Sequence, residues 1–463
     1  MIADEEADGE EPAEPIRRRR AAPPPVPTLV KRDLHPSLSD PALDTMNFLN
    51  EVTRRYPRAI SFAPGRPYDG FFDVEQVFTH IRRYLSHLRE QGSTPAEVRD
   101  AVFQYGPTAG LIREVIADAL RLDEGTDVPL ESIVVTVGAQ EAMFLVLRTL
   151  CATPDDVLLV SSPCYVGVTG AAGLLGVPVI PVPERPDGFH SADFEAAVHA
   201  ARRRDARPRA LYVVPDHSNP LGTTMSVTAR RELLEVAGRL GVLVIEDSPY
   251  RLVSPGERLP TLKSLDRRRT VVHLGSFSKS LFPGARVGFA VADQTVVDED
   301  GRTGLLADEL VKVKSMVTVN TSPLSQAVVA GMLLAGGGSA AALNTQSSEY
   351  YGAAMRATLR QLERRFPPER RERLDVRWNQ PSGGFFLALS VPFAADDDAL
   401  MRSAQEHGVI WTPMSYFHPD GGGSGRIRLS VSYLSEDEIT EGIARLAAFV
   451  ETEISDQGKG VLR

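Results

Sequence analysis

The hydrophobic positions of the chain fall into two patterns that alternate along its length. Apolar residues recur at helical spacing over residues 40–55, 74–90 and 111–122. Short apolar runs rich in β-branched residues are typical of buried strands, and they occupy residues 133–137, 157–160, 211–214, 242–245 and 271–274. Strands that alternate with helices predict an α/β fold, in which helices cover a mixed, mainly parallel sheet.

The pattern changes in the last quarter of the chain. A long helical segment over residues 339–365 is followed by short strand patterns, a helix near 398–407 and a strand over 426–432. This order favours a smaller α+β domain at the C-terminal end. We therefore expect a large domain over residues 73–338 and a small domain over residues 339–463. We expect an N-terminal segment, residues 37–72, to pack on the small domain.

Residues 1–36 differ in composition from the rest of the chain. Acidic residues come first, four arginines follow at 17–20, and a proline-rich stretch covers 23–27. Such a segment buries too little apolar surface to fold by itself, so we expect a disordered tail. The arginines could bind an acidic partner or nucleic acid, but a solvated tail is the favoured interpretation.

Composition narrows the class of protein. The chain has 463 residues, of which 43% are hydrophobic and 24% charged, and its net charge is −10. These values are typical of a soluble globular protein and favour neither nucleic acid nor an anionic membrane as a partner. No apolar run approaches the roughly 18 residues of a membrane span, and the acidic N-terminus is unlike a signal peptide. Cys151 and Cys164 lie in apolar surroundings, which favours the cytoplasm, and no metal site is expected.

The strongest chemical signal is a lysine between two strand-like runs. Lys279 is one of six lysines in the chain and sits in a short loop, with Ser276 and Ser278 before it and Arg286 after it. A buried amine loses its charge readily and attacks aldehydes, while hydroxyls and a guanidinium suit a phosphate dianion. An aldehyde and a phosphate occur together on pyridoxal 5′-phosphate (PLP). The alternative is a surface lysine in a serine-rich loop.

The run from Ser276 to Gly288 resembles the cofactor-lysine signature of fold-type I PLP-dependent enzymes, the class I/II aminotransferases. It is most similar to the branch that contains 2-aminoadipate and kynurenine aminotransferases, and the likeness extends from about residue 40 to about residue 455. The resemblance implies a PLP-dependent transferase-like large domain and a homodimer with shared active sites. It also implies that Lys279 holds PLP as a Schiff base and moves a proton while an amino group passes between an L-amino acid and a 2-oxo acid.

A turn before a helix is the candidate phosphate site. Strand 133–137 leads through Gly138-Ala139-Gln140 into a helix, so backbone N–H groups and the positive end of that helix face an anion. In the resembled family this turn is the phosphate cup. The resemblance therefore assigns phosphate binding to Gly138, Ala139 and Gln140, together with Ser276, Ser278 and Arg286.

Tyr105 precedes another Gly-containing turn and a helix. The resembled family has a tyrosine at such a position that reaches the cofactor phosphate of the neighbouring subunit, which would make the active form at least a dimer. A turn tyrosine packed on the core is the alternative.

Four residues at the ends of strand-like runs are expected to hold the cofactor ring. Asp247 follows the apolar run 242–245, and ligands of α/β proteins bind at this end of a parallel sheet. A carboxylate there can keep the pyridine nitrogen protonated, which makes the ring an electron sink. The resemblance assigns the phenolic oxygen to Asn219 and Tyr250, and stacking on the ring to Tyr165, for which a core tyrosine is the alternative. Lys279, Asp247 and Tyr250 are thus the candidate catalytic residues.

The substrate carboxylate calls for an arginine, because a guanidinium binds a carboxylate with two parallel hydrogen bonds. Arg428 matches the family's carboxylate-binding arginine, whereas Arg426 on the same strand fits a solvent-facing residue better. Gly65 lies in a Gly/Pro turn that, in the family, approaches the same carboxylate, and Asn219 adjoins the substrate. Met414 replaces the usual glycine of the family, which predicts a larger side chain near the substrate entrance.

The sequence is compatible with three functions. An aminotransferase is favoured, and the alternative is an enzyme of specialised metabolism with the same machinery that eliminates or replaces a β- or γ-substituent or adds a carbanion to an electrophile. Met414 and His217, which departs from the family pattern beside Asn219, point weakly to that alternative. A PLP-binding transcription regulator is the third reading. Regulators of this branch carry a winged-helix domain before the aminotransferase-like part, and residues 1–36 are too few and too proline-rich for one.

Overall fold

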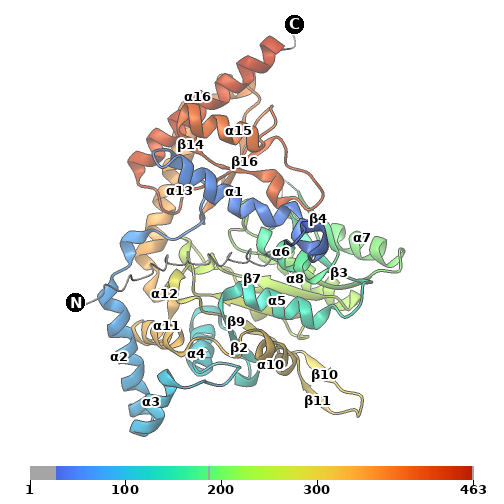
Figure 1. Ribbon diagram of the computed structural model, residues 1–463, viewed down its shortest axis with the longest axis vertical. Helices are drawn as coiled ribbons and strands as arrows, with labels where there is room; N and C mark the ends of the chain where they lie inside the picture. Colours follow the sequence, from blue (N-terminus) through green and yellow to red (C-terminus); the bar gives the residue numbers. More distant parts are fainter. Residues whose placement is uncertain (1–27, 186–187, 461–463) are drawn as a thin grey trace, which may run out of the picture.

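The computed structural model describes residues 28–185 and 188–460 and is organised around a sheet of eight strands (Figure 1). The strand order is β2-β9-β8-β7-β6-β3-β4-β5. The strands are β2 (Ile133–Thr136), β3 (Asp156–Ser162), β4 (Val179–Arg185), β5 (Gly188–Phe189), β6 (Arg207–Val213), β7 (Leu243–Asp247), β8 (Val271–Ser276) and β9 (Gly288–Val291). Strands β4, β3, β6, β7 and β8 pair in parallel, β9 is antiparallel to both neighbours, and β5 is antiparallel to β4. The predicted α/β fold with a mixed, mainly parallel sheet is confirmed.

Helices cover both faces of this sheet, which explains the unbroken apolar runs of its strands. Along β6, Ala210 and Tyr212 pack on one side while Leu211 and Val213 pack on the other. The first side is covered by α5 (Gly138–Leu150), α6 (Val166–Leu175) and α10 (Leu306–Val317). The second side is covered by α7 (Ser191–Arg202), α8 (Val227–Leu240) and α9 (Leu262–Leu265).

A third apolar cluster joins β2 and β9 to helices α2 (Val74–Glu90), α4 (Arg113–Glu124) and α11 (Pro323–Ala335). Helix α2 has the predicted bounds, and α4 begins and ends two residues later than predicted. Between them, α3 (Pro95–Phe103) begins at a capping box in which Thr94 and Glu97 satisfy each other's backbone N–H groups. A hairpin of β10 (Thr295–Val297) and β11 (Thr303–Leu305) projects beside α10 (Figure 1).

A second, antiparallel sheet lies above the first in Figure 1, with the order β12-β13-β16-β15. Its strands are β12 (Arg377–Trp378), β13 (Phe386–Ser390), β15 (Thr412–Pro413) and β16 (Arg426–Ser430). Its core also takes in side chains from α1 (Pro41–Arg55), α13 (Thr345–Arg365) and α16 (Glu436–Gly460). A separate pair, β1 (Ile60–Ser61) with β14 (Val409–Ile410), ties the N-terminal segment to this unit. The residue boundaries of the two domains stay a prediction.

Two predicted helices of the C-terminal part are interrupted. The segment 339–365 forms α12 (Ala340–Leu343) and α13, because the Asn344 side chain donates to the carbonyl oxygen of Ala340 and ends the first helix. The segment 398–407 forms α15 (Asp397–Arg402), which continues as a π turn up to Gly408. Helix α14 (Pro368–Arg373) lies between α13 and β12.

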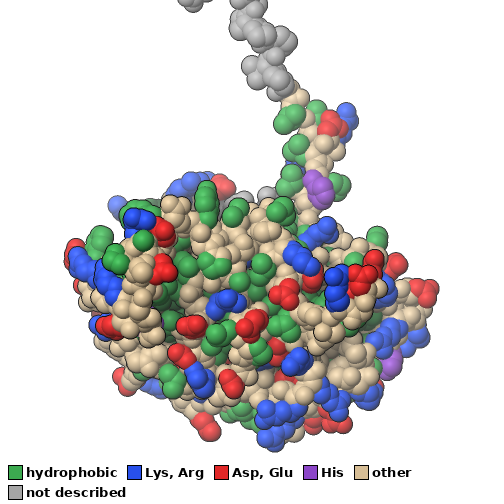
Figure 2. Space-filling model, turned by 90° about the horizontal axis from the view of Figure 1, so that it is seen from below, with side chains coloured by type: hydrophobic (Ala, Val, Ile, Leu, Met, Phe, Trp, Pro, Cys, Tyr) green, Lys and Arg blue, Asp and Glu red, His purple; other side chains and the backbone are tan. Residues whose placement is uncertain are grey.

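The predicted disordered tail falls largely outside the described residues, as do the arginine run and the proline-rich stretch within it. Residues 28–39 contain two short turns, η1 (Lys31–Asp33) and η2 (Pro36–Ser39). Figure 2 shows this stretch standing off the body, and on the face in view positive and negative side chains are interspersed. No helix in the described part of the chain is long and apolar enough to cross a membrane.

Candidate active site

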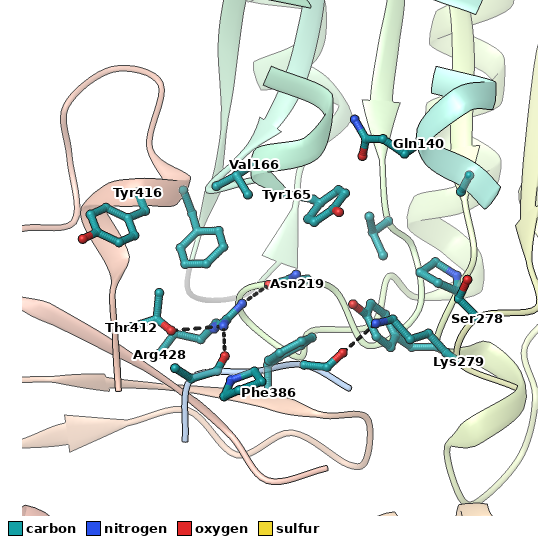
Figure 3. Close-up of a pocket in the computed structure, with 18 of the residues that line it drawn as sticks. Gln140, Tyr165, Val166, Asn219, Ser278, Lys279, Phe386, Thr412, Tyr416 and Arg428 are labelled. Atoms are coloured by element: carbon teal, nitrogen blue, oxygen red, sulfur yellow. Dashed lines mark hydrogen bonds between the residues drawn. The ribbon is translucent and has the colours of Figure 1, made fainter. Parts of the chain in front are cut away.

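A cavity of about 250 Å³ lies where the carboxyl ends of β6, β7 and β8 meet loops of the second sheet and helix α1 (Figure 3). The structure brings most of the predicted site residues into its wall. Those residues are Gly65, Ala139, Gln140, Tyr165, Asn219, Asp247, Tyr250, Ser276, Ser278, Lys279, Arg286 and Arg428. Residues distant in sequence thus converge on one site.

Lys279 follows the end of β8 and points into the cavity (Figure 3). Its Nζ atom donates a hydrogen bond of 2.6 Å to the carbonyl oxygen of Gly65. Burial lowers the pKa of Lys279 to about 8, helped by the nearby guanidinium groups of Arg286 and Arg428 and opposed by Asp247. A substantial fraction of the amine is therefore neutral near pH 8 and can act as a nucleophile or a base.

Asp247 ends β7 and is nearly inaccessible to solvent. Its Oδ2 atom accepts a hydrogen bond of 2.7 Å from the Tyr212 hydroxyl, while its buried Oδ1 atom has no partner among the described residues. Burial raises the pKa of Asp247 to about 6, although the Tyr212 hydrogen bond, His273 and Lys279 oppose that rise. A buried carboxylate oxygen at a cavity wall that has no hydrogen-bond partner among the described residues is suited to accept a hydrogen bond from a positively charged N–H group of a ligand.

Aromatic side chains line the cavity beside these two residues. Tyr250 is buried, with its ring centre 5.3 Å from that of Phe385 and 5.4 Å from that of Phe386. Burial raises the pKa of the Tyr250 hydroxyl above its ordinary value, so it stays protonated at neutral pH. Figure 3 places the ring of Tyr165 on the opposite side of the cavity from Phe386. A flat ligand ring fits between such walls.

The start of α5 forms the anion-binding end of the site. Gly138 has a φ of 71°, and a Cβ atom there would overlap the guanidinium of Arg286. Arg286 in turn donates from Nη1 to Ser278 Oγ over 2.9 Å. Gly138 therefore does not line the cavity itself but lets Arg286 approach the helix start. The Gln140 side chain donates to the carbonyl oxygen of Gly167, so its backbone N–H remains the candidate donor.

Arg428 of β16 is buried and held by fixed partners (Figure 3). Its Nη1 atom donates to Asn219 Oδ1 over 2.9 Å, and its Nη2 atom donates to Thr412 Oγ1 over 3.1 Å and to the carbonyl oxygen of Ala63. Burial lowers the pKa of Arg428 to about 10, so it remains charged at neutral pH. Its Cζ atom lies 4.6 Å from the centre of the Phe386 ring. A preorganised guanidinium of this kind suits a carboxylate.

Gly65 and Arg426 have different surroundings from Arg428. A Cβ atom at Gly65 would overlap the Phe386 ring, and the Gly65 carbonyl oxygen accepts from Lys279. Arg426 lies outside the cavity wall and donates to Ser390 Oγ over 3.4 Å.

Three residues singled out in the sequence lie away from the cavity wall. Tyr105 is 86% exposed and does not line the cavity. Met414 is fully buried in a cluster with Phe417, so the expected larger side chain at the substrate entrance is wrong. His217 is buried against Gly384, and its Nδ1 atom has no partner among the described residues.

The sequence analysis missed Tyr212, which contacts Asp247 but does not line the cavity, and several residues that do line it. Tyr212, the partner of Asp247, sits on the same face of the sheet as Asp247, and strand alternation carried across the β6–β7 pairing would have indicated it. Leu49, Asn50 and Thr53 come from α1 and carry no local signal, since only the packing of α1 brings them to the cavity. Phe386, Thr412, Tyr416 and Phe417 also line the cavity.

Comparison with known proteins agrees with this geometry. The family model described as "Aminotransferase class I and II" matches residues 75–446. The (S)-3,5-dihydroxyphenylglycine transaminase of Amycolatopsis orientalis is 48% identical over 91% of this chain and 94% of its own length. The 2-aminoadipate transaminase of Thermus thermophilus is 33% identical over 87% of this chain and 92% of its own length.

A solved structure agrees with this family assignment. The α-aminoadipate aminotransferase LysN of Thermus thermophilus, complexed with N-(5′-phosphopyridoxyl)-L-leucine, is 31% identical and superimposes with a TM-score of 0.71. The likeness covers 87% of this chain and 95% of that one.

Proposed function

The chain belongs to the class I and II aminotransferases, and from that premise we propose which amino acid it accepts and what its cavity residues do. The enzyme is a PLP-dependent transferase that moves an amino group between an amino acid and a 2-oxo acid. One observation carries the proposal for its residues. A buried lysine of lowered pKa, a fixed guanidinium and a buried carboxylate oxygen that has no hydrogen-bond partner in the described part of the chain share one cavity.

The cavity residues fit the cofactor. PLP, when bound, supplies an electrophilic carbon and a protonated pyridine ring that withdraws electrons. The free Oδ1 atom of Asp247 is suited to accept from the pyridine N–H, and Tyr165 supplies a ring to stack on the cofactor. Asn219 and Tyr250 are suited to the phenolic oxygen. The phosphate is proposed to lie against the start of α5 and Ser276, Ser278 and Arg286.

Two side chains are proposed to act on the substrate. Arg428 binds the α-carboxylate and so fixes the substrate α-carbon relative to Lys279. The Lys279 amine removes the proton from that carbon and later returns a proton, as a general base and then a general acid. Its lowered pKa suits both tasks near neutral pH. Asp247 keeps the ring nitrogen protonated throughout.

The rest of the cavity wall supports an uncharged aromatic side chain on the substrate. Among the described residues that line it, the cations are Lys279, Arg286 and Arg428, which are all committed to the cofactor or the α-carboxylate. The remaining wall carries aliphatic, aromatic and neutral polar groups, among them Leu49, Asn50, Thr53, Val166, Tyr416 and Phe417. The relative from Amycolatopsis is named for a dihydroxylated arylglycine. We propose that this enzyme uses such an arylglycine or its 2-oxo acid.

A half-reaction panel tests the substrate. The PLP-loaded enzyme is mixed with one amino acid at a time, without an oxo acid, and the absorbance of the cofactor is followed. We expect kcat/KM for 3,5-dihydroxyphenylglycine to exceed that for glutamate and 2-aminoadipate by about 10-fold or more, since an uncompensated carboxylate in an uncharged wall is costly. Faster reaction with 2-aminoadipate would refute the aromatic assignment. Release of ammonia without an oxo acid would instead indicate elimination chemistry.

We also propose that the active form is a homodimer in the cytoplasm. Several large apolar side chains are exposed on α2, α3 and the following turn, namely Val74 (74%), Phe78 (50%), Phe103 (80%) and Tyr105 (86%). A second copy of the chain would cover such a surface. Both cysteines are buried and free, which fits a reducing compartment, and cell fractionation would test that location.

A further inference from the structure

The strands that deliver Asp247 and Lys279 are joined by a buried ionic pair outside the cavity wall. Glu246 of β7 is directly opposite His273 of β8 in the sheet register. His273 Nδ1 lies 3.1 Å from Glu246 Oε2, and His273 Nε2 lies 3.6 Å from Glu124 Oε2 at the end of α4. His273 is 1% exposed and Glu246 is fully buried. An imidazole thus sits between two carboxylates in the interior of the protein.

The surroundings of Glu246 show that it is the charged partner. Its two carboxylate oxygens accept backbone N–H groups from Leu262 and Lys263 at 2.7 and 2.8 Å, in addition to the imidazole. Burial raises the pKa of Glu246, but the hydrogen bonds from His273, Lys263 and Leu262 outweigh burial and leave the pKa below its ordinary value. Glu246 is therefore a carboxylate at neutral pH.

The same geometry favours a charged imidazole. Burial lowers the pKa of His273, but the Glu124 and Glu246 carboxylates outweigh burial and leave the pKa above the ordinary 6.5. Lys263 of α9 opposes this rise, and its Nζ atom is paired with Asp293 at 2.6 Å. Burial raises the pKa of Glu124 above its ordinary value, and the positive charges of His273 and Arg251 oppose that rise. Removing any carboxylate from the cluster would favour loss of the proton from His273.

A small cavity of about 30 Å³, lined by apolar as well as polar side chains, adjoins this cluster. It is lined by Glu124 and His273 on one side and by Ser248 and Ser280, the neighbours of Asp247 and Lys279, on the other. Ser248 Oγ and Ser280 Oγ are buried there without a hydrogen-bond partner among the described residues, and Glu124 Oε2 has only the longer contact with His273. The cluster and the residues next to Asp247 and Lys279 thus line the same small cavity.

We propose that His273 is a positioning residue that acts as a buried imidazolium: held between Glu246 and Glu124, it fixes the ends of β7 and β8 and keeps Asp247 ionised for the cofactor nitrogen. This inference rests on the proposed role of Asp247. It assigns to Glu124 and Glu246 the task of keeping the charge on His273. In this arrangement a positive charge inside the fold supports the negative charge at the cavity wall.

The variant His273→Gln tests the charge, because glutamine can keep the hydrogen bond to Glu246 but carries no charge. PLP affinity of the apo protein is measured by absorbance titration from pH 5.5 to 8.5, alongside the midpoint of thermal unfolding. We expect the variant to bind PLP about 10-fold more weakly near pH 6.5. The loss of PLP affinity on acidification should set in about one pH unit higher in the variant than in the wild type. An unchanged profile together with a lower melting temperature would reduce His273 to a structural role.

A double-variant comparison isolates Asp247 from other groups that titrate in this range, such as Lys279 and the phosphate. In the Asp247→Asn background, His273→Gln should have no further effect on the affinity profile. A second shift of the same size in that background would overturn the proposal. A wild-type protein that binds no PLP would instead contradict the proposed function.

Glu124→Gln provides a second route if His273→Gln does not fold. It should move the affinity profile in the same direction by a smaller amount, because one carboxylate still faces His273. Nitrogen chemical shifts of the histidine rings give a direct reading of protonation. A neutral His273 ring at pH 6.5 in the wild-type apo protein would sink the proposal irrespective of any variant.

Discussion

Arg428 and Arg426 are alternate residues of one strand, yet the protein uses them differently. Arg428 is buried and donates to Asn219, Thr412 and the Ala63 carbonyl, while Arg426 donates to its strand partner Ser390. The sequence motif predicted different roles for the two residues, and only Arg428 lines the cavity. The burial and the fixed partners of Arg428 follow from the packing of β15, the segment after β1 and the loop after β6 around it.

We expect Arg428→Lys to lower kcat/KM by about 100-fold, mainly through KM for the amino acid, because an ammonium cannot make two parallel bonds to a carboxylate. Arg426→Lys on the same strand serves as the control and should change kcat/KM by less than about twofold. Steady-state kinetics with saturating PLP measure both. Equal losses in the two variants would show that strand distortion, not carboxylate binding, is responsible.

Asp247 gives a prediction on pH and stability. Its pKa is about 6 in the folded apo protein, mainly through burial, against an ordinary value of 3.8. Ionisation of Asp247 therefore does not lower the free energy of unfolding of the apo protein below about pH 4. Above about pH 6 it lowers that free energy by its full amount. We expect apo Asp247→Asn to be about 2 to 3 kcal/mol more stable than wild type at pH 7.5. The gain should disappear as the pH falls to 4.

Urea unfolding of both apo proteins at several pH values measures this difference. PLP affinity at pH 7.5 should change in the opposite direction and fall in the variant, because an amide offers the ring nitrogen no negative charge. A variant that is less stable at every pH would contradict the prediction. Tyr212 can still donate to the asparagine oxygen, so loss of that bond does not obscure the result.

At the scale of elements, the start of α5 shows how a turn and a helix make a site. The helix begins at Gly138, whose positive φ and missing Cβ let Arg286 approach. The turn was recognisable in the sequence because a glycine followed a buried strand and preceded a helix. The approach of Arg286 was not, since Arg286 reaches the turn from the far end of another loop.

We expect Gly138→Ala to weaken PLP binding by about 10-fold or more, because the new methyl group displaces the Arg286 guanidinium. Gly125→Ala is a matched control: Gly125 also has a positive φ, of 62°, but no atom lies within 4 Å of its Cβ position. Both variants carry similar backbone strain, so comparing their PLP dissociation constants separates strain from displacement. Equal affinities for the two variants would mean that Arg286 is not displaced.

The strands were easier to predict than the helix breaks. Strands covered on both faces are apolar throughout, and their runs at 133–137 and 271–274 coincide closely with β2 and β8. The break between α12 and α13 was missed, because the apolar spacing continues through Asn344 and only its side-chain bond to Ala340 ends the first helix.

At the scale of the whole molecule, the cavity wall is assembled from three separate parts. The eight-stranded sheet contributes Lys279 and Asp247, the second sheet contributes Arg428, and α1 contributes Asn50 and neighbouring residues. Tyr105 stays on the surface of this assembly. Its predicted place is in the site of a second copy of the chain, which makes its role a property of the dimer.

Co-expression of Lys279→Ala with Tyr105→Ala protomers tests that dimer. Each variant alone should be inactive or weak at limiting PLP. A mixed dimer holds one site with both wild-type residues, so random assembly should restore about a quarter of wild-type activity. No recovery, with mixed dimers present by affinity tagging, would show that Tyr105 serves its own subunit or none.

Lys279, Asp247 and Arg428 were predicted from the sequence, because apolar runs mark the ends of strands and the family signature marks the lysine and the arginine. All three line one cavity, and their roles stay predictions. The spatial structure was needed for the α1 residues of the cavity wall and for the Glu124–His273–Glu246 cluster. The residues that contact one another there are far apart along the chain, and such long-range contacts produce no periodic pattern in the sequence. They arise from the packing of one element on another.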